Sequence, residues 1–172
     1  PRIGVSKQDT LIDMDILEAC VRDELNVSAP RAFAVNKPLK VILTNFDGAL
    51  AEVSAPNPPQ DETMGRRTRG MSDRLWIEQD DFMEHPTPGF HRLVPGGEVR
   101  LRYCYVIKCD EVIKDANGVV VELRCSIDHA TLGKKTEGRN VKGIIHWLSG
   151  AHAEPAQLRL YERLLSTPQM TD

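Results

Sequence analysis

The chain has 172 residues, of which 41% are hydrophobic and 27% charged, a composition typical of a globular protein of one domain or one domain with an appendage. No apolar run reaches the roughly 18 residues that a membrane-spanning helix needs. The first residues lack the charged and apolar regions of a signal peptide. The formal net charge of −3 excludes a generally basic nucleic-acid binder, so such binding must come from a local patch.

The first expected element is a helix within residues 1–30. Apolar side chains recur at three- and four-residue steps from Met14 to Leu25, so they share one face of a helix. Asp13 suits the N-cap position, and Pro30 lies where the pattern ends. The chain lacks an initiator Met, and we therefore expect a piece cut from a longer protein.

Short strands joined by turns are expected after the helix. Residues 55–59 are proline-rich and 60–72 are polar and arginine-rich, which predicts a loop and then a long mobile loop. Asn117-Gly118 predicts a hairpin. Residues 157–166 fit either type of element, and their alternation favours a strand. The other strands are expected at residues 39–44, 50–53, 75–77, 98–108, 111–114, 119–127 and 143–148. Because these strands are short and sequential, they favour a mainly β protein, an antiparallel barrel or sandwich behind one helix.

The expected strand at residues 98–108 carries the most informative pattern. Its apolar side chains alternate with charged ones, which places Arg100 and Arg102 next to each other on the polar face. Two guanidinium groups on a rigid strand suit phosphates and the acceptor edges of bases. The alternative interpretation is a solvated outer face in which Glu98 pairs with the two arginines.

No arrangement of residues predicts catalysis. The histidines and cysteines show no metal-ligand spacing, and neither a serine elbow nor a glycine-rich phosphate loop occurs. We interpret the thiols as buried or half-buried in a reducing cytoplasm, with Cys104 and Cys109 on opposite faces of one strand. The four cysteines are Cys20, Cys104, Cys109 and Cys125. From the residues alone, we therefore predict a protein that binds a partner and has neither a catalytic site nor a metal site.

Several unusual motifs are spread over the chain, at residues 1–9, 29–32, 99–102, 105–108, 141–143, 145–147 and 159–161. Together they resemble the C-terminal half of bacterial glutaminyl-tRNA synthetase. The resemblance implies two anticodon-binding β-barrels, proximal and distal, related in fold to a ribosomal protein. It implies a helical linker from the catalytic half at 1–29, the proximal barrel at 30–154, and the truncated start of the distal barrel at 155–172.

The same resemblance implies a role for individual residues in reading the anticodon. Arg31 matches the arginine that contacts the middle base, a uridine, and Arg92 matches the one that serves the third base, a guanine. Arg100 and Arg102 match the pair at the first base and its phosphate, while Asn26 matches an asparagine near the anticodon stem. Splayed single-stranded bases are the usual targets of sequence-specific RNA recognition.

Further RNA contacts are expected at Phe90, His91 and Lys142. The family example has Gln, Tyr and Lys where this chain has Gly89, Phe90 and His91. Gly89 offers no side-chain hydrogen bond, and a histidine is mostly neutral at pH 7. Phe90 can still stack on a base.

The resemblance implies that the parent enzyme uses ATP with magnesium to attach glutamine to its tRNA. It implies a cytoplasmic monomer whose partner is the tRNA for glutamine, with neither DNA nor a membrane as a partner. This fragment itself is expected to need no cofactor, because the catalytic signatures of the class would lie upstream. Three alternatives remain: the equivalent part of an archaeal or eukaryotic-type glutamyl-tRNA synthetase, a free-standing ribosomal-protein-like RNA binder, and a purely structural barrel.

Overall fold

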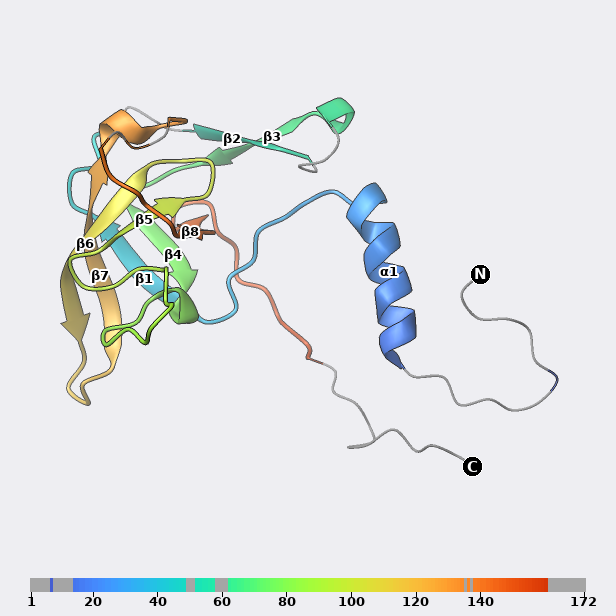
Figure 1. Ribbon diagram of the computed structural model, residues 1–172, viewed down its shortest axis with the longest axis horizontal. Coiled ribbons are helices and arrows are strands. Elements are labelled where there is room, and N and C mark those ends of the chain that lie inside the picture. Colours follow the sequence, from blue (N-terminus) through green and yellow to red (C-terminus); the bar gives the residue numbers. More distant parts are fainter. Residues whose placement is uncertain are drawn as a thin grey trace. The chain divides into compact units, whose positions relative to one another are not determined.

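The structure, a computed structural model, describes residues 7, 14–48, 52–57, 62–134, 136 and 138–160. Within these residues one helix precedes nine strands, which confirms the expectation of a mainly β protein (Figure 1). The elements are α1 (Met14–Ser28), β1 (Pro38–Leu43), β2 (Glu52–Pro56), β3 (Arg66–Gly70), β4 (Arg74–Glu78), β5 (Glu98–Leu101), β6 (Val106–Lys114), β7 (Val120–Asp128), β8 (Ile144–Ile145) and β9 (Leu148–Ser149). Short 3₁₀ turns lie at Glu62–Met64, Gln79–Asp81 and His129–Thr131.

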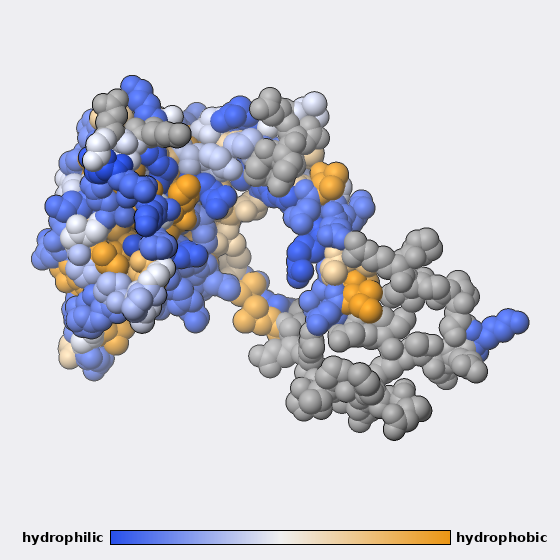
Figure 2. Space-filling model, viewed as in Figure 1, coloured by the Kyte–Doolittle hydropathy of each residue, from blue (hydrophilic) through white to orange (hydrophobic). Residues whose placement is uncertain are grey.

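The chain divides into two compact units. One contains residues 1–30 and 157–172, and the other contains 31–156. In the first unit, α1 has no buried residue, and its apolar side chains, such as Leu17 and Leu25, are exposed. In the described part of the chain, no helix is both long and apolar enough to cross a membrane. The strands all belong to the second unit, whose visible surface is mostly hydrophilic with small apolar patches (Figure 2).

Seven strands of the second unit form one curled sheet in the order β8-β5-β6-β7-β1-β4-β9. The two edge strands are consecutive in the chain, because only His146 and Trp147 separate β8 from β9. Three residue steps span at most about 11 Å, so the sheet must curl until its edges approach each other. Most pairings are antiparallel as expected, but β1 with β7 and β5 with β8 are parallel.

The core fills the inside of this curled sheet. In β1, exposed or half-buried residues alternate with buried ones, as a strand with one covered face requires. Trp147 is fully buried, and its indole Nε1 donates a hydrogen bond to the carbonyl of Arg102 at 3.2 Å, so it ties the sheet edge to the end of β5. Other fully buried side chains include Val41, Leu75, Ile77, Leu93, Val99, Leu101, Leu123 and Ile145.

The expected single strand at 98–108 is wrong, because the chain reverses there. β5 ends at Leu101 and β6 begins at Val106, and the two pair as an antiparallel hairpin. Tyr103 adopts φ 65° in the turn, and the amide of Cys104 donates to the carbonyl of Leu101 at 2.8 Å. The side chains of Tyr103, Cys104 and Tyr105 fold back onto the core, so apolar contacts continue through turn residues that are not extended.

This turn also corrects the expected placement of two cysteines. Cys104 lies in the turn and Cys109 lies in β6, so they do not occupy opposite faces of one strand. Both side chains are buried. Cys125 is buried as well and Cys20 is half-buried, which confirms the interpretation of the four thiols as buried or half-buried.

The expected mobile loop at 60–72 is also wrong for most of its described residues. β3 pairs with β2 in a two-stranded ribbon, and β2 continues to Pro56, into the expected proline-rich loop. Arginine side chains of β3 donate hydrogen bonds to β2. Arg66 donates to Ser54 Oγ at 2.7 Å, and Arg67 donates to the Pro56 carbonyl at 2.7 Å. The polar residues of this segment therefore belong to an exposed two-stranded ribbon. The ribbon is ordered because its two strands are bonded to each other.

The hairpin at Asn117-Gly118 is confirmed. The Asp115 carboxylate accepts hydrogen bonds from the amides of Asn117 and Val119, and Gly118 adopts φ 81°. The expected strand at 143–148 is two short strands, β8 and β9. At the end of the chain, residues 157–160 form no regular element, and the rest of the strand expected at 157–166 lies outside the described residues.

Candidate nucleic-acid interface

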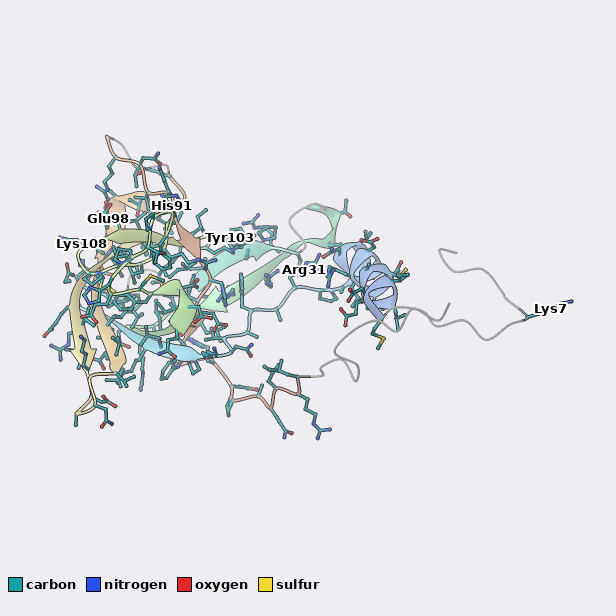
Figure 3. The ribbon with its side chains drawn as sticks, turned by 60° about the horizontal axis from the view of Figure 1, so that its bottom comes forward. Lys7, Arg31, His91, Glu98, Tyr103 and Lys108 are labelled. Carbon is teal, nitrogen blue, oxygen red and sulfur yellow. The ribbon has the colours of Figure 1, made fainter. Side chains whose placement is uncertain are left out.

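A polar cleft of about 310 Å³ opens on the second unit beside the start of β5. Its lining brings together three residues expected to contact RNA, namely His91, Arg92 and Lys142. His91 and Glu98 both line this cleft, and they lie near each other in Figure 3. The complete lining is His91, Arg92, Glu98, Asn140, Val141, Lys142 and Gly143.

Backbone packing holds the two walls of this cleft together. The carbonyl of Gly143 accepts a hydrogen bond from the amide of Arg100 at 2.9 Å, which fixes one wall to β5. A Cβ added to Gly143 would lie 2.0 Å from the carbonyl oxygen of His91 on the other wall. Because such an approach is impossible for any side chain, glycine is required where the walls meet.

The guanidinium of Arg92 is held from beneath by a carboxylate. Arg92 is about half exposed, and its Nη1 forms an ion pair with Oδ1 of Asp81, whose side chain is only 2% exposed. Asp81 ends the short turn after β4. One edge of the guanidinium is thus occupied, which leaves its other donors for a ligand in the cleft.

Arg139 bridges two strands behind the cleft wall. Its Nε lies 2.8 Å from a carboxylate oxygen of Glu98 on β5, and its Nη2 pairs with Asp128 at the end of β7. The hydrogen bond from Arg139 lowers the pKa of the Asp128 carboxyl, and the two acids raise the pKa of Arg139. Glu98 therefore pairs with Arg139, which differs from the alternative interpretation in which it pairs with Arg100 and Arg102.

The two strand arginines have different surroundings. The guanidinium of Arg100 donates to the carbonyls of Cys104 at 3.2 Å, Thr131 at 2.9 Å and Lys134 at 2.7 Å. It thereby ties the β5–β6 turn to the loop after β7. Arg102 follows the end of β5, and its side chain is exposed. The structure therefore does not present the pair as one planar donor surface, because Arg100 already binds backbone carbonyls.

The remaining predicted contacts lie elsewhere. Asn26 is exposed on α1 and belongs to the first compact unit, whereas Arg31 is the first residue of the second. Figure 3 shows Arg31 apart from His91 and Glu98. Phe90 is half-buried, with its amide bonded to the Thr87 carbonyl at 3.1 Å, and it does not line the cleft.

A stack of aromatic and guanidinium groups fixes the segment after Arg31 to the sheet. The Arg69 guanidinium lies 3.9 Å from the ring centroid of Phe33 and 4.5 Å from that of Trp147. The Phe33 ring also stacks on His146, with 6.2 Å between centroids. Burial and the neighbouring Arg67 lower the pKa of Arg69 to about 10. Such cation–π contacts favour the charged form and offset part of the cost of its burial.

The sequence interpretation missed several residues of this interface. Asp81 lies in a short acidic turn that carries no recognisable motif, and only its burial next to Arg92 gives it a role. Asn140 lies in the basic segment at 134–142, but nothing in the spacing of its residues points to a cleft. Phe33 and Arg69 are far apart in the chain, so only the fold brings them together.

The chain is similar in sequence to one described protein family and to several curated proteins. The family described as "tRNA synthetases class I (E and Q), anti-codon binding domain" matches residues 29–128. The Glutamine--tRNA ligase of Chromobacterium violaceum is 57% identical over 166 residues, 96% of this chain and 30% of that protein. The Glutamine--tRNA ligase of Neisseria meningitidis serogroup A is 56% identical over the same shares.

The Glutamine--tRNA ligase of Escherichia coli O157:H7 is 48% identical over 168 residues, 97% of this chain and 30% of that protein. The chain thus spans 30% of the length of these three curated relatives.

Proposed function

The chain belongs to the family of anticodon-binding domains of class I tRNA synthetases (E and Q), and from this premise we propose that the cleft at Arg92 receives an anticodon base of a tRNA. The observation that carries the proposal is the convergence of Arg92, His91 and Lys142 on one cleft of a chain whose net charge is −3. Cationic and donor groups are concentrated locally although the chain as a whole is acidic.

The chemistry of the cleft suits a guanine. An arginine can donate two parallel hydrogen bonds to O6 and N7 of guanine, which is the commonest specific arginine–base contact. Lys142 is exposed beside it and supplies a charge for the neighbouring phosphate. We assign Arg92 to the third anticodon base on this chemistry and on the family resemblance.

The roles of the other arginines are proposed with their geometry in mind. Arg102, exposed after β5, is assigned to the first anticodon base or its phosphate. Arg100 would have to release three carbonyls to contact RNA directly, so it acts chiefly by holding the loop that contains Lys134. Arg31 and Asn26 remain assigned to the middle base and to the anticodon stem.

We also propose that the full-length protein attaches glutamine to its tRNA with ATP and magnesium, as a cytoplasmic monomer. The name of the relatives, Glutamine--tRNA ligase, supports the attachment of glutamine to a tRNA. In the described residues no three His, Cys, Asp or Glu side chains are grouped so that they could hold a metal ion, and no step is assigned to ATP or magnesium in this chain. A charging assay with the full-length protein on the tRNAs for glutamine and glutamate distinguishes this proposal from the glutamyl alternative.

The division of the chain is likewise a proposal, with a linker at 1–29, a proximal barrel at 30–154 and the start of a distal barrel at 155–172. The compact unit at 31–156 supports the two proposed boundaries of the proximal barrel, because they lie within two residues of the ends of that unit.

The base-binding role is tested by fluorescence anisotropy with RNA hairpins that carry the anticodon loop, with guanine or adenine as the third anticodon base. We expect the chain to prefer guanine, and Arg92→Ala to lower that preference by about 1–3 kcal/mol. Arg124→Ala, which removes an exposed arginine on β7 that pairs with Glu111 and Glu122, is the charge-matched control. An unchanged guanine preference in Arg92→Ala rejects the role.

A further inference from the structure

We propose that Asp81 is a positioning residue for base recognition, because it fixes the plane of the Arg92 guanidinium. This inference rests on the proposed role of the cleft. Asp81 is 1% exposed, so it does not contact RNA itself. It acts only through the ion pair between its Oδ1 and Nη1 of Arg92.

Stability alone does not account for this carboxylate. The second oxygen of Asp81, Oδ2, is buried and has no hydrogen-bond partner among the described residues. Burying a carboxylate with only one of its oxygens paired is unfavourable, and an apolar residue of similar volume is often as stable or more so. A buried acid paired to a half-exposed arginine therefore suggests a role in controlling the arginine.

The backbone around the pair is rigid. The amide of Leu93, the residue after Arg92, donates to the carbonyl of Asp81 at 3.0 Å, and the amide of Met83 donates to the carbonyl of Leu93 at 3.1 Å. Phe82 and Leu93 pair as an isolated bridge, and both side chains are buried in the core. The main chains on both sides of the ion pair are thus held in register by core packing.

A fixed guanidinium recognises a base better than a mobile one. An exposed arginine side chain otherwise loses much rotamer entropy when it binds, and prior fixation avoids that loss. Since the guanine contact needs two parallel donors in one plane, the direction set by Asp81 determines whether the fork meets O6 and N7 together.

Positioning and simple charge effects predict opposite signs, which makes the inference testable. RNA is an anion, so removing a negative charge near the cleft would by itself tighten binding of every hairpin. If Asp81 positions Arg92, its removal weakens binding of the guanine hairpin and leaves the adenine hairpin unchanged or slightly tighter. Asp80 is the exposed neighbour of Asp81 and provides a control of equal charge.

The experiment compares Asp81→Asn, Asp80→Asn, Arg92→Ala and the Asp81→Asn/Arg92→Ala double variant of this chain, with the guanine and adenine hairpins as probes. We expect the unsubstituted chain to prefer guanine by about tenfold or more, and Asp81→Asn to reduce this ratio to about threefold or less. Asp80→Asn should keep the ratio. In the Arg92→Ala background, Asp81→Asn should have no further effect on it.

The outcomes separate the inference from the function on which it rests. If Arg92→Ala lowers the guanine preference but Asp81→Asn keeps it, the positioning role is wrong and the cleft remains a base site. If Arg92→Ala has no effect, the proposed function fails and the inference fails with it. Should Asp81→Asn not fold, Asp81→Glu retains the charge and shifts the carboxylate by one methylene. A guanine preference that Asp81→Glu leaves intact overturns the inference.

Discussion

At the scale of single residues, the arginines of this chain differ in what already holds their guanidinium groups. Arg100 is bonded to three backbone carbonyls, and Arg69 lies between two aromatic rings. Arg92 is held by one buried carboxylate, and Arg102 is exposed with no ion pair or side-chain hydrogen bond among the described residues. Of these four arginines, Arg92 and Arg102 therefore retain the most donors for a ligand.

This difference predicts that Arg100 and Arg102 contribute differently to stability and RNA binding. Arg100→Ala removes bonds from a charged donor to three carbonyls, and we expect the free energy of unfolding to fall by about 2–3 kcal/mol. Arg102→Ala should change it by less than about 0.5 kcal/mol, because the side chain is exposed, but should weaken RNA binding. Urea unfolding and hairpin titrations measure both. Equal losses of stability in the two variants would contradict the assignment.

A pH prediction follows from the ion pair between Asp128 and Arg139. Arg139 lowers the pKa of Asp128 in the folded chain, so the pair adds stability above the unfolded pKa of about 3.9 and loses it as the pH falls through the lower folded value. The contribution is small, because both partners are exposed to solvent, which screens the pair.

The measurement is the free energy of unfolding of the unsubstituted chain and of Asp128→Asn between pH 7 and pH 2. The gap between the two should be constant down to about pH 5 and should close in more acidic solution. Asp110→Asn, which removes a carboxylate 4.0 Å from Lys108, is the control. A gap that stays constant down to pH 2 would show that the ion pair does not stabilise the folded chain.

Sequence reasoning on single residues predicted part of the lining of the candidate site. Arg92, His91 and Lys142 were predicted and line one cleft. Asp81 was missed because its role depends on burial, and local spacing does not reveal burial. Arg100 was expected to face a ligand, but its bonds to carbonyls that lie up to 34 residues away in the chain become visible only in the fold.

At the scale of elements, the strands with a clear alternation were predictable and the short reversals were not. The hairpin at Asn117-Gly118 was predicted because that dipeptide favours the positive φ that a tight turn needs. The reversal at Tyr103 was missed because its turn contains neither glycine nor proline, and its apolar side chains fold onto the core. The β2–β3 ribbon was missed because its exposed polar side chains resemble those of a loop.

The close approach of two elements at Gly143 predicts a matched pair of glycine variants. Gly143→Ala must push the cleft walls apart, since its Cβ would overlap the His91 carbonyl, and we expect a loss of stability of about 1–3 kcal/mol together with weaker binding of the guanine hairpin. Gly118→Ala should cost about 1–2 kcal/mol through its positive φ but leave RNA binding unchanged.

Thermal unfolding and hairpin titrations of the two glycine variants distinguish the effects. If both variants bind the guanine hairpin equally well, the wall at Gly143 has no part in the site.

At the scale of the whole molecule, the core belongs to the unit at 31–156. In the described part of the chain, all nine strands and the buried core side chains lie within that unit, while α1 contributes no buried residue. We therefore expect a protein of residues 31–156 to unfold cooperatively at the same urea midpoint as the 172-residue chain. A much lower midpoint, or a broad transition, would mean that residues 1–30 or 157–172 are needed for folding.

The central claim is that the cleft at Arg92 receives the third anticodon base. It is tested most directly by photocrosslinking an RNA hairpin whose third anticodon base is 6-thioguanosine, followed by mass spectrometry of the crosslinked peptides. We expect crosslinks to the two cleft walls, at residues 91–92 and 140–143, and their loss when an excess of the unmodified guanine hairpin competes. Crosslinks confined to α1 or to the β2–β3 ribbon would contradict it.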